Sequence, residues 1–308
     1  MNDVWMRAFS LLFFLVLGLI LKKAGVVHQS DFGVLSRIVL RVTLPCAVVV
    51  NLNGADIDLS MLGITLMGLM IGVLLMGCGY LLYIRKSRAL RAFGLLNLAG
   101  FNIGNFALPF IQGMLGATGA LVTSIFDVGN SIVCLGGAYS IASLVKYRGE
   151  GQSAAASFRR VGKAMITSVP FDFYIGMAIL GLLHISLPDP VVAVAQVGAN
   201  ANPFLSMFML GVAFRLGSVQ ERFGEMLRIL VVRYGVCIAI ALAIYFLLPY
   251  PEAVRQPLCL LCLAPIGSAI PPFTHELGED YTFSGTINSI SVLISIALIL
   301  GTITVFFA

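Results

Sequence analysis

Charged side chains are scarce in this sequence: only 11% of its 308 residues are Asp, Glu, Lys or Arg, whereas 59% are hydrophobic. Soluble domains usually carry about 25% charged residues, so this composition excludes an ordinary soluble fold and predicts lipid as the solvent. A helix that spans a bilayer needs about 20 mostly apolar residues. Ten such stretches with short connections use nearly the whole chain, so we expect no separate soluble domain.

The sequence also lacks the motifs of enzymes and metalloproteins. Its three histidines, His28, His184 and His275, fall near predicted membrane surfaces, and no two of them have metal-ligand spacing. No Gly-x-Ser-x-Gly elbow, Gly-x-Gly-Asp protease signature or His-Glu-x-x-His zinc motif occurs. The six cysteines lie inside apolar segments, where small buried residues are expected rather than disulfides. We therefore expect a non-enzyme without cofactor or metal.

The pattern of apolar windows predicts ten membrane-spanning helices. They are expected at residues 5–21, 32–53, 60–84, 90–111, 117–145, 163–183, 189–214, 226–248, 256–275 and 282–307. Basic residues gather in four of the connections, around Lys22, Arg85, Lys146 and Arg215. Because basic loops favour the cytoplasmic side, we expect a multi-pass protein of the inner (plasma) membrane with both termini outside. Topology thereby explains the net charge of +5 without a nucleic-acid partner.

One polar connection divides the chain into halves. It predicts a first five-helix repeat at 1–148, a cytoplasmic linker at 149–162 and a second repeat at 163–308. The halves share weak identities at nearly constant spacing, namely Gly18 with Gly176, Asp31 with Asp189, Pro45 with Pro203, Pro109 with Pro271 and Gly116 with Gly278. Five helices is an odd number, so the second repeat is expected to cross the membrane in the opposite sense. Inverted repeats are common in transporters, with the substrate near the midplane between them.

The fourth and ninth predicted helices carry helix breakers inside apolar spans. The fourth reads Gly100-Phe-Asn-Ile-Gly-Asn-Phe-Ala-Leu-Pro109 and the ninth reads Ala264-Pro-Ile-Gly-Ser-Ala-Ile-Pro-Pro272. Proline and glycine interrupt helices, and half-helix N-termini offer unpaired N–H groups to an anion. If the breaks cross near the midplane, the substrate-binding candidates are Asn102, Asn105, Pro109, Ser268 and Pro271, with Gly104, Pro265, Gly267 and Pro272 as break or hinge residues. Ordinary kinks packed by neighbouring helices are the alternative.

The second and seventh predicted helices also contain midspan prolines. Thr43 and Pro45 mark one break, and Pro203 marks the other; a structural kink is the simpler role for each. Asn200 and Asn202 lie next to Pro203, and unpaired amides are unfavourable in hydrocarbon. We therefore expect these two amides to face a cavity or a helix interface, with substrate contact as one interpretation.

Two acids fall near the middle of predicted helices, Asp127 in the fifth and Asp172 in the sixth. A carboxylate within the membrane is a functional hypothesis by default, here as proton carrier, cation ligand or gate. Asn130 lies one turn after Asp127 on the same face and joins this coupling or gating group. The alternative is a protonated or hydrogen-bonded structural acid.

The segments Asn102-Ile-Gly-Asn-Phe-Ala-Leu-Pro109 and Phe126-Asp-Val-Gly-Asn130 resemble the auxin efflux carrier family, which includes plant auxin exporters and bacterial permeases for malonate and malate. The resemblance implies ten helices with helices four and nine crossing at prolines, as in NhaA-type antiporters and bile-acid symporters, and substrate beside the crossover. The short linker is similar to that of bacterial members. Because Ile270-Pro271-Pro272 departs from the plant pattern, auxin itself is not the expected substrate.

Together these features predict a secondary active transporter of a small organic anion, a mono- or dicarboxylate, working by elevator-like alternating access. A sodium-coupled symporter of the bile-acid type and a non-transporting ligand sensor are the alternatives. The exact substrate, import against export, proton or sodium as coupling ion, and a homodimer are left open by the sequence.

Overall fold

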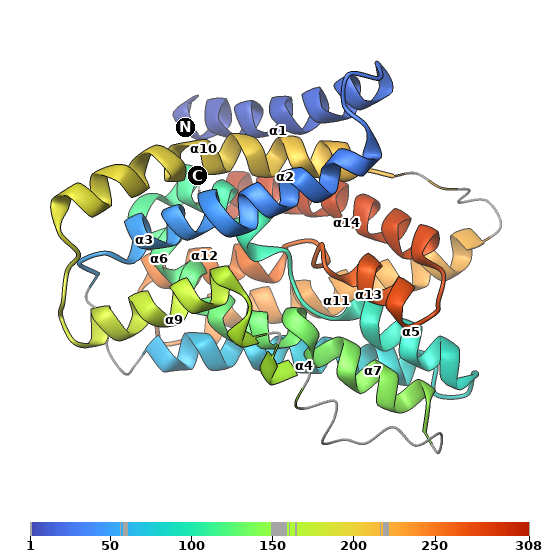
Figure 1. Cartoon of the computed structure of the whole chain (residues 1–308). Coiled ribbons are helices and arrows are strands. Elements are labelled where there is room, and N and C mark those ends of the chain that lie inside the picture. Colours follow the sequence, from blue (N-terminus) through green and yellow to red (C-terminus); the bar gives the residue numbers. More distant parts are fainter. Residues whose placement is uncertain are drawn as a thin grey trace.

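The computed structural model describes residues 2–55, 57, 61–148, 159, 161–163, 165–215, 217 and 222–307, and most of the predicted linker therefore lies outside the described residues. The described part is helical and contains no strand (Figure 1). Its α-helices are α1 (Asn2–Lys23), α2 (Phe32–Ile38), α3 (Leu44–Leu52), α4 (Leu62–Leu82), α5 (Arg88–Leu98), α6 (Leu108–Ile132), α7 (Ala138–Lys146), α9 (Val169–Leu182), α10 (Asp189–Ala213), α11 (Phe223–Leu247), α12 (Glu252–Cys262), α13 (Ile270–Glu276) and α14 (Tyr281–Thr302).

The described chain contains seven helical stretches that are long and apolar enough to cross a membrane. This confirms an all-α membrane protein, whereas the prediction of ten helices is not confirmed at the level of single spans. The difference has local causes. α6 runs from the predicted fourth helix into the predicted fifth, so that Arg88–Lys146 counts as a single stretch in spite of its break, and α9 at the sixth predicted position has only 14 residues. The predicted ninth helix is divided into α12 and α13, which have 11 and 7 residues.

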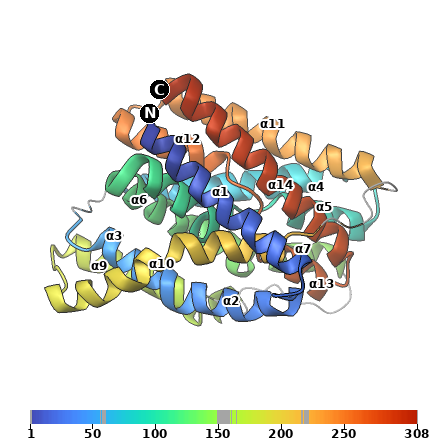
Figure 2. The same cartoon turned by 90° about the horizontal axis from the view of Figure 1, so that it is seen from above.

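The helices form two groups. In the first group α1 packs along α10, which also contacts α2 and α3, while α9 packs against α3. In the second group α4 contacts α5 and α6, α12 contacts α6 and α11, and α13 contacts α14. Figure 2 shows α2, α3, α9 and α10 together on one side and α4, α5, α11, α12 and α14 on the other. We name these the first helix group (α1, α2, α3, α9, α10) and the second helix group (α4–α7, α11–α14).

Close backbone contacts tighten each group. A Cβ atom added at Gly18 of α1 would collide with the carbonyl oxygen of Phe208 in α10, and one added at Gly68 of α4 would collide with that of Phe126 in α6. Small residues at such positions let helix backbones approach each other in membranes. Each pair of helices is therefore packed as a unit.

Two Leu-Pro sequences follow π-helical turns. Val39–Thr43 is a π-helix directly before Leu44-Pro45, and Ile103–Ala107 is a π-helix directly before Leu108-Pro109. A proline cannot donate to the carbonyl four residues earlier and clashes with it, and a wider turn relieves that clash. By contrast, Pro203 lies inside the continuous helix α10.

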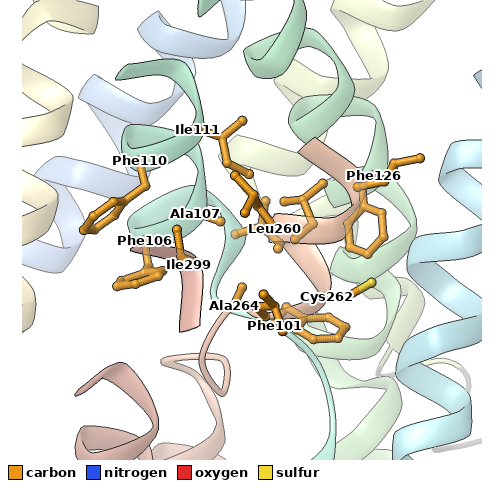
Figure 3. Packing of buried hydrophobic residues seen from close by; sticks show 14 of the residues in the cluster. Phe101, Phe106, Ala107, Phe110, Ile111, Phe126, Leu260, Cys262, Ala264 and Ile299 are labelled. Carbon is orange, nitrogen blue, oxygen red and sulfur yellow. The ribbon is translucent and has the colours of Figure 1, made fainter. Parts of the chain in front are cut away.

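The interrupted helices meet in the second group. After α5 the chain leaves the helix at residues 99–102, and after α12 it does so at residues 263–269 before α13 begins. The two irregular segments are joined by a backbone hydrogen bond of 2.9 Å from the Asn102 N–H to the Pro265 carbonyl oxygen. Figure 3 shows Phe101 and Ala264 side by side at this crossing, among buried apolar side chains that include Phe106, Phe126 and Leu260.

Candidate functional site

A cavity of about 150 Å³ opens beside the crossing. This volume is well above the roughly 10–15 Å³ that one water needs, so it admits a small polar ligand. Both breaks and both helix groups contribute to its wall, which is formed by Leu40, Leu44, Phe101, Asn102, Ile103, Gly104, Asn105, Asp127, Asn130, Ser131, Cys134, Leu135, Ser168, Pro170, Tyr174, Gly267, Ser268 and Ala269. We call it the crossover cavity.

Two amides from the first break face this cavity with unused hydrogen-bonding capacity. Asn102 and Asn105 are 3% and 6% exposed, and neither the Asn102 Nδ2 nor the Asn105 Oδ1 has a partner among the described residues. The Asn105 Nδ2 donates to the Ser268 Oγ at 3.3 Å, which links the first break to the second. Because buried polar groups are normally paired, these free positions are places for a polar ligand.

The half-helices that start at the breaks direct their N-termini to the same place. Asn102 is the residue before the π-helix Ile103–Ala107, and Ala269 is the residue before α13. The first N–H groups of a helix have no partner within that helix, and they form the positive end of its dipole. Both positive ends therefore lie at the wall of the crossover cavity, an arrangement that suits a negatively charged ligand.

Asn130 replaces the backbone partners that the first break has lost. Its Oδ1 accepts from the Phe101 N–H at 2.9 Å, and its Nδ2 donates to the Phe101 carbonyl oxygen at 3.0 Å. The Nδ2 also donates to Asp127 at 2.8 Å. A break within a membrane is tolerated only where protein or water satisfies the freed backbone groups. The structure thus gives this amide a clamping position on the break.

The second break is satisfied in a similar way by α14. The Asn288 Nδ2 donates to the Ile266 carbonyl oxygen at 2.8 Å, and the Ser291 Oγ accepts from the Ile266 N–H at 3.1 Å. Sequence reasoning did not single out these two residues. Their signal was a polar side chain in an otherwise apolar span.

Asp127 is a buried carboxylate in the cavity wall, with 6% of its surface exposed. Its described hydrogen bond comes from Asn130, and the buried Tyr174 of α9 lies close enough to interact with it electrostatically. The Tyr174 hydroxyl has no hydrogen-bond partner at bonding geometry among the described residues. A carboxylate that shares the cavity wall with both positive helix ends and lies close to the Tyr174 hydroxyl can hold a proton or a cation there.

Arg233 is a fully buried arginine that sequence reasoning missed. It lies in the middle of α11 with 0% exposure, and its guanidinium stacks over the Phe101 ring at 4.9 Å. It donates to the carbonyl oxygens of Leu98, Gly100 and Ala264 at 2.6, 2.8 and 3.2 Å. The signal was available in the sequence, because a charged residue in the middle of an apolar helix is a functional hypothesis by default.

The far ends of the half-helices also meet cations. Arg7 donates to the Gly113 carbonyl oxygen at 3.0 Å. Gly113 lies near the end of the half-helix that begins at Ile103 and is kinked at Gly116. Lys146 donates to the Leu277 carbonyl oxygen at 2.7 Å, directly after α13, and also pairs with Glu279 at 2.6 Å. Cations stabilise the negative C-terminal end of a helix dipole. The negative ends are therefore compensated by side chains, whereas the positive ends at the cavity are left for a ligand.

Other predicted site residues lie elsewhere. Pro109, Asn200 and Pro203 line a second cavity of about 430 Å³ together with Arg7. Asn200 is exposed and accepts a hydrogen bond from Gln196. In the described residues neither Asn200 nor Asn202 lines the crossover cavity, so their substrate contacts stay predictions.

Asn202 is buried between α10 and the π-helix of residues 39–43, where its Oδ1 accepts from the Thr43 Oγ1 at 2.9 Å. Pro271 is buried near the start of α13, whereas Pro272 is exposed. Pro265 joins the two breaks through its carbonyl oxygen, and Gly267 lines the crossover cavity.

Asp172 is not in the middle of a helix, as the sequence had indicated. It lies exposed in the first turn of α9, because Ser168 and Pro170 start that helix later than predicted. A carboxylate in a first turn is stabilised by the helix dipole. Its coupling or gating role stays a prediction, with less physical support than that of Asp127.

The described residues contain no group of three or more His, Cys, Asp or Glu side chains that could hold a metal ion. The polar side-chain groups of the cavity are amides, hydroxyls, one carboxylate and the Cys134 thiol. These groups can donate hydrogen bonds to a small polar solute and accept hydrogen bonds from it.

The fold and the crossover cavity together define a multi-pass α-helical membrane protein with a polar site between interrupted helices, the construction of a membrane transporter. The model of the family described as membrane transport protein matches residues 3–169. The chain belongs to this family, and the match confirms the resemblance to the auxin efflux carriers. The family is one of transporters rather than enzymes. A search of curated proteins finds no match.

Proposed function

We propose that this protein is a secondary active carrier for a small organic anion, a mono- or dicarboxylate, which binds in the crossover cavity. The observation that carries the proposal is the convergence of two half-helix N-termini and the free Asn102 amide on one small cavity. Backbone N–H groups and positive dipole ends form ready anion sites. The carboxylate of the ligand would lie at these N-termini, with Asn105 and Ser268 as side-chain partners.

The proposal includes ten membrane passes arranged as two inverted repeats. Gly116 and Gly278, which the sequence aligns, both adopt a left-handed conformation, with φ values of 67° and 72°. The pairing of helices in the first helix group points the same way. If the chain is built from two repeats, α9 corresponds to α1 and α10 corresponds to α3. The contact between α1 and α10 then has a counterpart between α9 and α3, and both contacts occur.

Alternating access would move the second helix group past the first. The two groups meet mainly around α6, where side-chain hydrogen bonds run from Gln112 to Asn51 at 3.1 Å and from Arg7 to Gly113 at 3.0 Å. Both half-helices of the crossing belong to the second helix group, so the ligand would travel with that group. Few polar links across the boundary favour sliding of rigid units.

A sodium-coupled carrier is the second candidate, and Asp127 is the observation that favours a coupled cation. Its carboxylate, the Asn130 amide and the Tyr174 hydroxyl lie in or against the same wall as the proposed anion site. A proton on Asp127 would serve the same purpose without further ligands. Sodium and proton coupling differ in whether binding depends on sodium or on pH.

The test is uptake of radiolabelled malonate, malate, succinate, lactate and pyruvate into liposomes that contain the purified protein, with Asn105→Ala as the inactive control. We expect accumulation of at least one acid, driven by an imposed proton or sodium gradient. Thermal-shift measurements on the same panel separate binding from transport, since a ligand that binds only the folded state raises apparent stability. Binding without flux would support a sensor, and neither binding nor flux across the panel would contradict the carboxylate assignment.

A further inference from the structure

Arg233 combines three features that the proposed mechanism does not use. Its side chain is fully buried, it carries a positive charge, and no carboxylate pairs with it in the part of the chain that the structure describes. An uncompensated buried charge is strongly destabilising. A residue whose only task was to satisfy carbonyl groups would need hydrogen-bond donors but no charge.

The three carbonyl partners show what the charge faces. Leu98 is the last residue of α5, Gly100 follows it by two residues, and Ala264 follows the end of α12. The last carbonyl groups of a helix form the negative end of its dipole. Arg233 therefore lies at the negative C-terminal ends of both α5 and α12, and its planar guanidinium contacts both of them at once.

We propose that Arg233 is a positioning residue that makes the crossover cavity electropositive. It neutralises the negative C-terminal ends of α5 and α12, so that the positive N-terminal ends of the half-helices that begin at Ile103 and Ile270 dominate the cavity. Arg233 does not line the cavity and does not touch the ligand. It acts through the Phe101 segment, on which its guanidinium stacks. The functional meaning of this field rests on the proposed anion carrier, but its sign is measurable without any substrate.

Cys134 provides the probe for that measurement. Its thiol lines the crossover cavity and lies 3.6 Å from the Phe101 carbonyl oxygen, so it is close to the segment that Arg233 holds. Cys237, Cys259 and Cys262 are buried. Cys46, Cys78 and Cys134 are partly exposed, so Cys46→Ala and Cys78→Ala together leave Cys134 as the accessible thiol.

The experiment compares the labelling rates of Cys134 by two methanethiosulfonate reagents of similar size, the anionic sulfonatoethyl form and the cationic trimethylammonioethyl form. The full-length protein in detergent is used, with Arg233, Arg233→Met and Arg233→Lys side by side. Two unit charges about 10 Å apart at an effective dielectric constant of about 20 alter such an encounter roughly tenfold. We expect Arg233→Met to lower the anionic-to-cationic rate ratio at least about tenfold, and Arg233→Lys to keep the ratio within about threefold of that with Arg233.

Arg228→Met is the matched control, because Arg228 lies on the same helix, is exposed and loses the same charge. It should leave the ratio unchanged. Equal ratios with Arg233 and Arg233→Met would overturn the proposal, as would a ratio in Arg233→Lys as low as that in Arg233→Met. If Arg233→Met does not yield monodisperse protein, Arg233→Lys is compared with Arg233→Gln, since both lose the fork and only lysine keeps the charge.

The outcome is independent of whether the ligand is a carboxylate. An electropositive cavity that depends on Arg233, in a protein that transports none of the tested acids, would leave this inference intact and contradict only the choice of substrate. Transport of an acid, together with an unchanged labelling ratio in Arg233→Met, would contradict this inference and leave the proposed anion carrier intact.

Discussion

Replacement of Asn130 by alanine tests whether the first break is held by a side-chain clamp. The change removes four hydrogen bonds: two with the backbone of Phe101, one to Asp127 and one from the Cys134 thiol. It leaves the buried Phe101 N–H without its partner and removes a donor from the Phe101 carbonyl oxygen. A buried polar group left unsatisfied costs about 1–3 kcal/mol, whereas side-chain hydrogen bonds in membrane proteins average about 0.6 kcal/mol each. One unsatisfied N–H and three other lost hydrogen bonds at about 0.6 kcal/mol each should therefore lower the free energy of unfolding by about 3–5 kcal/mol.

The assay is equilibrium unfolding in mixed micelles, with Asn200→Ala as the matched control. Asn200 is an exposed asparagine of α10 whose described hydrogen bond is with Gln196 on the same helix. Its replacement should change the free energy of unfolding by no more than about 0.5 kcal/mol. An Asn130→Ala variant as stable as Asn200→Ala would refute the clamp and leave the break to be held by other contacts.

Asn130→Asp refines this test, because aspartate keeps the acceptor for the Phe101 N–H and loses the donor. An ionised aspartate would also face the carboxylate of Asp127. We expect a stability loss that is smaller at low pH, where the protonated side chain regains a donor. A loss that is independent of pH would show that the donor side of the clamp is unimportant.

Three further predictions concern the crossover cavity. Asn105→Ala should abolish ligand-induced thermal stabilisation while the protein stays folded and monodisperse; unchanged affinity would remove this amide from the site. For an acid that stays ionised over the tested pH range, the wild type should bind more tightly as the pH falls, because a proton on Asp127 removes a competing negative charge. The affinity of Asp127→Asn should not change with pH. If the pH response of the wild type persists in Asp127→Asn, the proton binds elsewhere. In the protein with Cys46 and Cys78 replaced by alanine, a saturating ligand should slow maleimide labelling of Cys134 severalfold, and an unchanged rate would place the ligand outside this cavity.

The sequence predicted the positions of the breaks because their causes are local. Gly100 and Pro109 in one helix, and Pro265 and Pro272 in the other, disfavour regular helix whatever surrounds them. The structure interrupts the two helices at residues 99–102 and 263–269, which include Gly100 and Pro265. The same reasoning nominated Asn102, Asn105 and Ser268, which the structure brings to one cavity wall.

The partners of the breaks were not predictable from local chemistry. Asn130 was assigned to coupling or gating from its spacing to Asp127, whereas its amide is occupied by Phe101, which no periodicity indicates. Arg233 meets Leu98 across 135 residues of sequence. Such pairings depend on the packing of distant helices, and a single sequence without aligned relatives carries no record of that packing.

Helix ends produced the remaining differences. Asp172 was placed in midspan because the apolar window around it begins at residue 163, and hydropathy does not register that Pro170 restarts the helix. A proline near a helix start fixes the first turn, in which an acid is stabilised. The same acid therefore changes from a costly buried group to an ordinary exposed one when the helix boundary moves by a few residues.

The charge balance of the crossover cavity connects the proposed anion site with Asp127. An ionised Asp127 and an anionic ligand would share the same positive helix ends, so each would weaken the binding of the other. Protonation of Asp127 removes that competition and leaves a donor for the ligand. Because coupling between two bound species is reciprocal, the ligand must raise proton affinity by the same factor as the proton raises ligand affinity. A bound sodium ion would offset the charge in the same way, with the Asp127 carboxylate, the unpaired Asn105 Oδ1 and the Tyr174 hydroxyl as oxygen ligands in the same wall. Either cation would therefore be linked to the ligand through the charge of Asp127, and the two differ in whether ligand affinity follows pH or sodium concentration.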